Sequence, residues 1–364
     1  MTNLSLLVLF LFPAFTLSGQ IARSIAIAMC LLCAHPKVTK KLAEPGILLF
    51  TWFAWAVLCS YQSDNFQLAL FGYHKRFEGL VTWILAISFG WLFWRTSTLD
   101  RLFLTCKAIL AICLLVMIFR PDIYKSLIFG HITIAAFASI VSCMLMAKHP
   151  AYIALALPFI YLTMNRSMIL ALSLGSITYV VINRKYISEL FMMKWYPWVF
   201  MVIVLALAIF GAYPKLKKID SSSLGTGFRS QMVIQSIHAF TQRPLTGYGI
   251  DTLSKVLHQR NDVNAEHNWN DMGNGHFVRN YFDVDRSHNI FLDILLQTGI
   301  IGLIISLFIL TRMTYRTFCY PLEINQACLY GVSAVIGFGL MNPFGIPAMF
   351  LMCLCILGIE KEEV

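Results

Sequence analysis

The feature that most constrains this chain is a succession of apolar segments, each about as long as a bilayer is thick. Of its 364 residues, 58% are hydrophobic and 13% are charged, whereas soluble domains are about 45–50% apolar and about 25% charged. Several segments reach the roughly 17–25 residues that a helix needs to cross the hydrocarbon core. Backbone amides in lipid must be paired internally, and these segments lack the alternation of barrel strands. The sequence therefore predicts an all-α integral membrane protein.

We expect a polytopic bundle of about twelve transmembrane helices. Their approximate ranges are 3–18, 20–35, 46–61, 79–94, 102–119, 131–147, 150–164, 167–183, 196–213, 288–311, 323–341 and 345–359. Residues 1–19 lack the basic start of a signal peptide, so we interpret them as the first helix. The predicted regions are 1–213 with helices 1–9, a large loop at 214–287, and 288–364 with helices 10–12 and a short tail.

Basic residues set the predicted orientation, because loops rich in Lys and Arg stay in the cytoplasm. The net charge is +10, and this topology explains it without nucleic acid as a partner. We assign to the cytoplasm the loops that contain Lys37, Lys40, Lys41, Arg95, Arg101, Lys148, Arg184, Lys185, Lys194, Arg312, Arg316 and Lys361. The large loop then lies on the extracytoplasmic face of the membrane.

The large loop has the composition of an ordered cover rather than of a linker. Residues 228–240 read as an amphipathic helix, and Pro244, Gly247 and Gly249 follow as turn residues. The stretch 261–285 mixes Asn, Asp and His with aromatic side chains, which argues against disorder. We expect the loop to contain short helices and to cover a site.

No cofactor or metal site is predicted. All ten cysteines fall in or beside apolar segments, which argues against a disulfide framework. His258, His267 and His276 have no ligand-like spacing, and the chain has neither a Walker loop nor a GxGxxG motif. A glycosidase-like pair among the loop carboxylates remains open, but no spacing singles one out.

The sharpest local motif is Ser287-His288-Asn289, followed by an apolar helix with Gly299 and Gly302. Ser287 is a suitable N-cap, which would place His288 in the first turn, where the helix dipole disfavours imidazolium. A neutral imidazole at a wet interface can act as a general base. The alternative is an interfacial hydrogen bond at the end of a helix.

Four arginines lie on the side where the positive-inside rule disfavours cations: Arg76, Arg166, Arg229 and Arg243. Arg166 sits in a very short turn between two apolar segments, and a charge at that depth needs a partner. A lipid-linked diphosphate would suit the planar guanidinium, which binds phosphate oxygens in pairs. The alternatives are snorkelling to lipid headgroups and, for Arg76, an ion pair with Glu78.

These motifs together resemble the O-antigen ligase and O-antigen polymerase superfamily, which includes bacterial protein O-oligosaccharyltransferases. The resemblance covers about residues 160–305. Its carriers are Phe228-Arg229, the segment from Arg243 to Gly249, the segment from Asp285 to Asn289 with Gly299 and Gly302, and Asn165-Arg166-Ser167. The stretch from Gly72 to Leu80 is similar to a first-loop segment of some members.

The resemblance implies metal-independent glycosyl transfer from undecaprenyl diphosphate at the periplasmic face of the bacterial inner membrane. His288 and Arg229 would be catalytic. Arg166, Arg229, Arg76 and Arg243 would bind the donor diphosphate, and the glycines would serve turns and close packing. The partners would be the lipid-linked glycan donor, a glycan or lipid A-core acceptor, and membrane lipid.

Several functions share this pattern. We expect an O-antigen ligase-like enzyme; the enzyme alternatives are a polymerase of O-antigen or surface polysaccharide and a protein O-oligosaccharyltransferase. A transporter of the lipid-linked glycan is the non-enzyme alternative. It should show broken helices at the midplane and a repeat of two halves, and the sequence offers only Asn342-Pro343 and no repeat.

Overall fold

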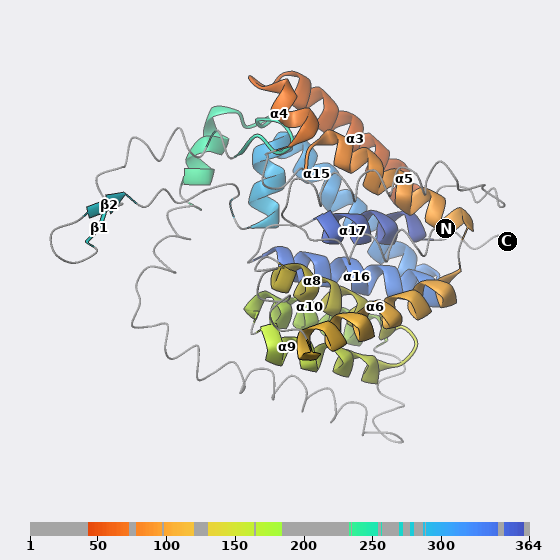
Figure 1. Cartoon of the computed structure of the whole chain (residues 1–364). Helices are drawn as coiled ribbons and strands as arrows, with labels where there is room; N and C mark the ends of the chain where they lie inside the picture. Colours follow the sequence, from red (N-terminus) through yellow and green to blue (C-terminus); the bar gives the residue numbers. More distant parts are fainter. Residues whose placement is uncertain are drawn as a thin grey trace.

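The computed structural model is a bundle of helices with one short pair of strands at its side (Figure 1). It describes residues 43–72, 78–96, 98–119, 130–163, 165–183, 235–253, 269–271, 277–279, 289–340 and 346–359, with Val233, Val256 and Ser287. The helices are α3 (Glu44–Tyr61), α4 (Phe66–Phe71), α5 (Leu80–Thr96), α6 (Leu99–Phe119), α8 (Gly130–Leu145), the 3₁₀ helix η1 (Pro150–Ala156), α9 (Leu157–Thr163), α10 (Arg166–Ile182), α15 (Ile290–Cys319), α16 (Glu323–Gly339) and α17 (Ile346–Gly358). Strands β1 (Trp269–Asp271) and β2 (Phe277–Arg279) pair antiparallel.

These helices confirm the predicted helical fold and follow the predicted apolar segments closely. The segment 150–164 is one continuous helical segment of two types, because the 3₁₀ helix η1 is followed directly by the α-helix α9. Residues 235–242 are helical, in agreement with the second half of the helix predicted at 228–240. The predicted helices 3–18, 20–35 and 196–213 lie outside the described residues.

Three details differ from the sequence prediction. Helix α15 does not end near residue 311 but continues to Cys319, so Arg312 and Arg316 are helical rather than part of a loop. The short helix α4 follows α3, and the β1–β2 pair adds strands to a loop predicted to hold only helices. The extension of α15 has a physical reason, because the Glu44 carboxylate forms ion pairs with both arginines and neutralises part of their charge within the helix.

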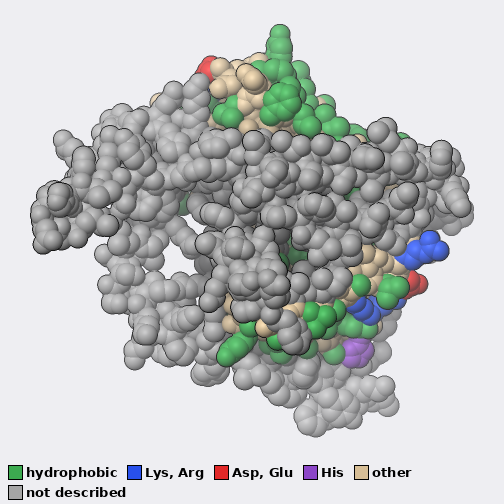
Figure 2. All heavy atoms as spheres, viewed as in Figure 1, with side chains coloured by type: hydrophobic (Ala, Val, Ile, Leu, Met, Phe, Trp, Pro, Cys, Tyr) green, Lys and Arg blue, Asp and Glu red, His purple; other side chains and the backbone are tan. Residues whose placement is uncertain are grey.

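Surface and interior have the polarity expected of helices packed in lipid. Among the described residues, α3 and α15 are long and apolar enough to cross a membrane, and five shorter apolar helices accompany them. Leu104 and Ile304 are 70% and 58% exposed, while Ser139, Thr317 and Asn325 are fully buried. Hydrophobic side chains predominate on the described surface in Figure 2, and basic ones gather near one end. The number of crossings stays a prediction.

Helix α16 lies at the centre of the bundle, packed against α8, α10, α15 and α17. Its Gly337 lies against the backbone of Leu170 and Ala171 in α10, and a side chain there would overlap them. Small residues at such contacts allow helix backbones to approach closely, which is how helices associate in a membrane. At the end of α16, Gly339 lies against Ile290, the first residue of α15. The starts of α10 and α15 therefore lie at the same end of the bundle.

The opposite end of the bundle carries the charged pairs. Glu44, at the start of α3, accepts a hydrogen bond from Arg312 Nε at 2.8 Å and forms an ion pair with Arg316 Nη2 at 3.2 Å. Lys148 binds Asp100 and lies 3.8 Å from Glu323. The Asp100 carboxylate raises the pKa of Lys148. Lys148, Arg312 and Arg316 all belong to the predicted cytoplasmic set, so the structure groups these residues of that set at one end.

Candidate functional site

Helix α15 is broken at Gly299, at the end of the bundle opposite to the charged pairs. Gly299 has φ 67° and ψ −172°, a conformation open to glycine but costly for other residues. The break interrupts the ladder of backbone hydrogen bonds and leaves several groups without helical partners. Trp55 of α3 supplies one replacement, because its indole N–H donates to the carbonyl of Thr298 at 2.8 Å.

The segment Arg243–Gly249 supplies the remaining partners. The Tyr248 N–H donates to the Leu296 carbonyl at 2.8 Å, and the Gly249 N–H donates to the Gln297 carbonyl at 2.9 Å. In return, the Ile300 N–H donates to the Pro244 carbonyl at 2.9 Å. The segment is thus docked on the break by three main-chain hydrogen bonds, and two motifs about fifty residues apart form one structural unit.

Glycines make this close docking possible. A Cβ atom at Gly299 would overlap the carbonyl of Leu245, and one at Gly247 would overlap the carbonyl of Leu296. Gly247 and Gly249 also have positive φ angles of 65° and 95°. A Cβ atom at Gly302 would overlap the Thr298 side chain. The predicted structural role of these glycines, in turns and close packing, is confirmed.

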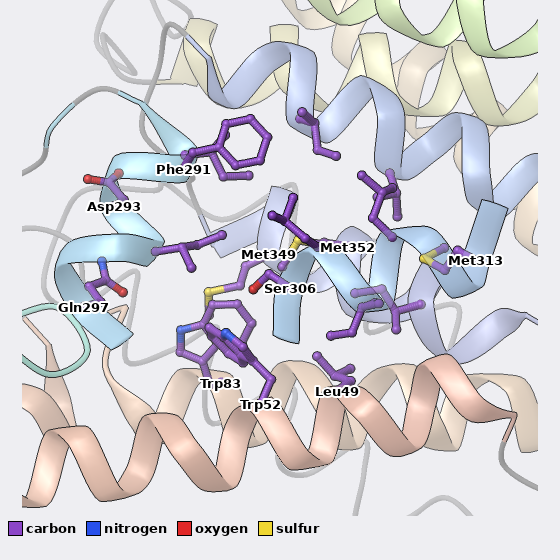
Figure 3. Close-up of a pocket in the computed structure, with 18 of the residues that line it drawn as sticks. Leu49, Trp52, Trp83, Phe291, Asp293, Gln297, Ser306, Met313, Met349 and Met352 are labelled. Carbon is purple, nitrogen blue, oxygen red and sulfur yellow. The ribbon is translucent and has the colours of Figure 1, made fainter. Parts of the chain in front are cut away.

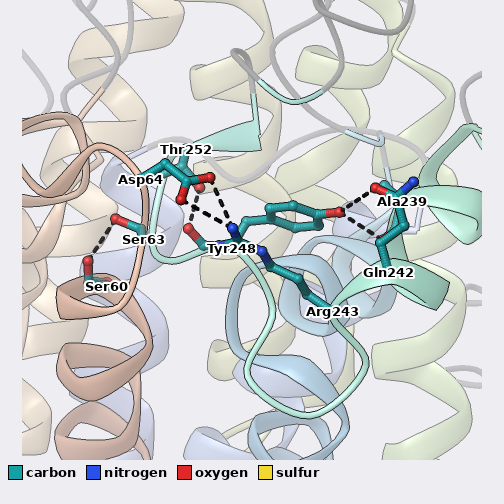
Figure 4. A network of polar contacts seen from close by, with 8 residues as sticks. All are labelled: Ser60, Ser63, Asp64, Ala239, Gln242, Arg243, Tyr248 and Thr252. Atoms are coloured by element: carbon teal, nitrogen blue, oxygen red, sulfur yellow. Dashed lines mark hydrogen bonds and ion pairs between the residues drawn. The ribbon is translucent and has the colours of Figure 1, made fainter.

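Tyr248 joins the docked segment to the helix that precedes it. Its ring packs with Ala239 and Leu296 in a small hydrophobic cluster, and its hydroxyl donates to the Ala239 carbonyl at 2.9 Å (Figure 4). On the other side, the Ile250 N–H donates to Ser60 Oγ at 3.0 Å. The segment therefore rests on both α15 and the end of α3.

Arg243 is the one predicted donor-binding arginine whose side chain the structure describes. Its Nη2 atom lies 2.9 and 3.1 Å from the two carboxylate oxygens of Asp64 (Figure 4). Its guanidinium carbon lies 5.2 Å from the centre of the Tyr248 ring. Asp64 is 75% exposed, and ion pairs of such exposed groups contribute only about 0–1 kcal/mol. The guanidinium is therefore held in place by a partner that an anionic ligand can replace.

Asp251 ties the first-loop segment to the same unit. It is buried, has a φ of 53° and accepts the backbone N–H of Glu78 at 3.3 Å. A Cβ atom at Gly72 would lie 2.6 Å from the Asp251 carboxylate. The residues on both sides of the segment 73–77 thus contact Asp251. Arg76, predicted to bind the donor, is in that segment and lies outside the described residues.

The start of α15 corrects the predicted cap. The N-cap is Asn289, not Ser287: its side-chain oxygen accepts the N–H groups of Phe291 and Leu292 at 3.0 and 3.2 Å. Ser287 instead donates its N–H and its hydroxyl to Asp293 Oδ1, at 2.9 and 2.7 Å. The helix begins after the cap, so His288 precedes it in the chain. The argument that placed His288 in the first turn was wrong, and the residue itself lies outside the described part.

The turn before α10 agrees with the prediction. Asn165 is the N-cap, and its side-chain oxygen accepts the Ser167 N–H at 2.9 Å. Arg166 is the first residue of α10 and follows α9 with almost no connection. Its backbone lies at the same end of the bundle as Ser287 and Asn289. The structure does not describe the Arg166 side chain, and Arg229 lies outside the described residues.

A cavity of about 90 Å³ opens beside the start of α15. It lies between α3, α5, α15, α16 and α17 and is lined mainly by apolar side chains (Figure 3). Asp293 and Gln297 lie near each other on α15 in Figure 3, and Trp52 and Trp83 form another part of the lining. Glu78 also lines the cavity. Within the part of the chain that the structure describes, no three His, Cys, Asp or Glu residues form a group that could hold a metal ion.

Sequence reasoning missed Asp64, Asp251 and Asp293 as parts of this site. Asp293 had a usable signal, since it stands within one turn of a capping motif, where a carboxylate often reaches back to the preceding chain. Asp64 and Asp251 had none. Asp64 pairs across 179 positions and Asp251 across 173, and only the fold brings such distant residues together.

Comparisons with known proteins match the part of the chain that contains these motifs. Residues 151–307 match the family described as O-Antigen ligase, and this range contains Arg166, Arg229, Arg243, His288 and Gly299. A comparison with curated proteins found no match. This match supports the resemblance of the chain to the O-antigen ligase and O-antigen polymerase superfamily.

Proposed function

We propose that the protein transfers a glycan from undecaprenyl diphosphate to a sugar hydroxyl of lipid A-core, at the periplasmic face of the bacterial inner membrane. The observation that carries this proposal is the docking of Arg243–Gly249 on the break at Gly299. This docking brings Arg243 to the end of the bundle at which the start of α10 and the residues on either side of His288 also lie. That end is opposite to the one that holds Lys148, Arg312 and Arg316.

The proposed reaction requires an anion site and a base. Arg229, with Arg166, Arg76 and Arg243, would bind the diphosphate and stabilise its charge as the bond to the sugar breaks. A new bond would form between the acceptor oxygen and the anomeric carbon. The electron pair of the broken carbon–oxygen bond would leave with undecaprenyl diphosphate, and His288 would take the proton from the acceptor hydroxyl. Arginine would act as the countercharge, so we expect transfer in the presence of EDTA.

The same site could serve a different acceptor. A polymerase would use a second lipid-linked glycan, and a protein O-oligosaccharyltransferase would use a protein hydroxyl; both need the same diphosphate site and base. Transport of the lipid-linked glycan is disfavoured by a specific observation. The carbonyls freed by the break in α15, those of Leu296, Gln297 and Thr298, all have partners within the protein, whereas broken helices in transporters leave such groups for the cargo.

Deletion of the gene in its host distinguishes these functions. A gel of surface glycans should show lipid A-core without any attached glycan, if the protein is the ligase. A single repeat unit on the core would indicate a polymerase instead. Unchanged surface glycans with unglycosylated protein would indicate an oligosaccharyltransferase, and accumulation of the lipid-linked glycan on the cytoplasmic face would contradict an enzyme.

A further inference from the structure

Three residues that line the cavity beside α15 each carry a buried polar atom without a hydrogen-bond partner among the described residues. These atoms are Asp293 Oδ2, Gln297 Nε2 and Trp52 Nε1. The three residues are only 3%, 6% and 5% exposed. Buried polar atoms in folded proteins nearly always have a partner, because an unmet hydrogen bond is unfavourable. An unmet acceptor and two unmet donors in one cavity therefore indicate a polar ligand.

The arrangement of these atoms defines the chemistry of that ligand. Asp293 and Gln297 are four residues apart on α15, so their side chains lie on the same face of the helix and close together in Figure 3. A carboxylate oxygen accepts a hydrogen bond, and an amide nitrogen donates one. A hydroxyl group does both, so a sugar hydroxyl can satisfy the pair. The aromatic rings of Trp52 and Trp83, 4.8 Å apart, offer an apolar surface beside it for the carbon–hydrogen face of a sugar ring.

Charge argues against the donor diphosphate as the occupant. Asp293 and Glu78 both line the cavity, and its lining contains no Lys or Arg among the described residues. Two carboxylates in a poorly hydrated site repel a diphosphate, while they attract neutral groups that donate hydrogen bonds. The site therefore suits a sugar of the acceptor better than the first sugar of the donor, which is attached to the diphosphate.

Asp293 also links the cavity to Ser287, the residue before His288 in the sequence. Its Oδ1 atom accepts the N–H and the hydroxyl of Ser287, and its Oδ2 atom has no partner among the described residues. One carboxylate thus fixes the residue before the proposed base and offers its other oxygen to a ligand. We propose that Asp293 and Gln297 bind a hydroxyl group of the acceptor glycan and position it for proton transfer. This assignment rests on the proposed function.

Purified protein in lipid vesicles allows the assignment to be tested through the two KM values. Asp293→Asn keeps an oxygen for Ser287 but presents a donor in place of Oδ2, and Gln297→Glu presents an acceptor in place of Nε2. Each change should raise the acceptor KM about tenfold to a hundredfold, as expected for loss of a hydrogen bond to a charged or buried group. The donor KM should stay within about twofold of the wild-type value.

The double variant Asp293→Asn with Gln297→Glu exchanges donor and acceptor and provides a rescue test. A hydroxyl can bind the exchanged pair, so the acceptor KM should return to within about fivefold of wild type. Thr311→Ala is the matched control, because Thr311 lies on the same helix, is exposed and donates its hydroxyl to the Leu307 carbonyl. It should leave both KM values unchanged.

Binding can also be measured without turnover. Trp52 and Trp83 line the cavity, so the acceptor should cause a saturable change in tryptophan fluorescence in the absence of donor. That change should be lost in Asp293→Asn. Three results would overturn the assignment. The single variants could raise the donor KM alone, they could leave both KM values unchanged, or all three variants could lose kcat equally, with no rescue in the double variant. If wild type binds acceptor but transfers nothing from any lipid-linked donor, the proposed function fails while the subsite stands.

Discussion

The backbone N–H of Tyr248 donates a 2.8 Å hydrogen bond to the carbonyl oxygen of Leu296, and the site is organised around this contact. It exists because Gly299 breaks α15 and frees that carbonyl from its helical partner. The ring of Tyr248 then packs on Leu296 and lies beside the Arg243 guanidinium. A change in the backbone of one helix thus determines where a predicted donor-binding residue lies.

Substitution of Gly299 should therefore disrupt more than local packing. Gly299→Ala places a Cβ atom against the Leu245 carbonyl and forces a side chain into a backbone conformation that is essentially restricted to glycine. Such strain costs about 1–3 kcal/mol before any overlap. We expect a lower melting temperature in detergent and exposure of residues 243–249 to protease. Ile304→Ala, at an exposed position of the same helix, is the control. Equal stability of the two variants would show that the docked segment does not depend on the break.

Asp64 should compete with the donor for Arg243. Asp64→Asn removes the negative charge from the exposed ion pair, which contributes about 0.2–1 kcal/mol, so the donor KM should fall by a factor of up to about five. Arg243→Ala should raise it. If the ion pair were only structural, both substitutions would lower kcat or stability. The donor KM would then not fall in Asp64→Asn and rise in Arg243→Ala.

Arg229 and Arg166 should depend on the shape of the guanidinium and not only on its charge. Lysine keeps the charge but loses the two-pronged hydrogen bonding, so Arg229→Lys and Arg166→Lys should each lose most transfer activity, and the alanine variants more. Arg101→Ala, at the opposite end of the bundle, should retain activity. Full activity of both Arg229→Ala and Arg166→Ala at normal expression would exclude the proposed diphosphate site.

The proposed topology places residues 214–287 outside the cell membrane. On a background without native cysteines, Asn264→Cys should react with an impermeant maleimide in intact spheroplasts. His149→Cys, beside Lys148 at the charged end, should react only after lysis. The reverse labelling pattern would show that the protein has the opposite orientation in the membrane and that the proposed site faces the cytoplasm.

The helices were predictable from the sequence because an apolar segment of bilayer length has few alternatives to a helix. The end of α15 was not predictable, because two arginines so close together suggested a loop. In the structure Arg312 and Arg316 pair with Glu44 of α3, a helix far from them in the sequence. The N-cap was misassigned for a similar reason. Ser287 and Asn289 both suit a cap, and the bonds from Ser287 to Asp293 decide between them.

The candidate site was predictable only in part. The motifs around Arg243 and Gly299 suggested turns and close packing, and the structure confirms both. The sequence could not show that these two motifs bind each other. The hydrogen bonds between them are made by main-chain groups, which every residue possesses. The ion pair of Arg243 with Asp64 depends on the tertiary fold in the same way.

The most direct test of the central claim is transfer by purified protein in vesicles, with lipid-linked glycan and lipid A-core supplied together. We predict one new glycosidic bond for each undecaprenyl diphosphate released, with and without EDTA. His288→Asn should remain folded but lose about 10²–10⁴ in rate, since it keeps hydrogen bonding and loses basicity. Movement of intact lipid-linked glycan between leaflets, with no glycosidic product, would contradict the account.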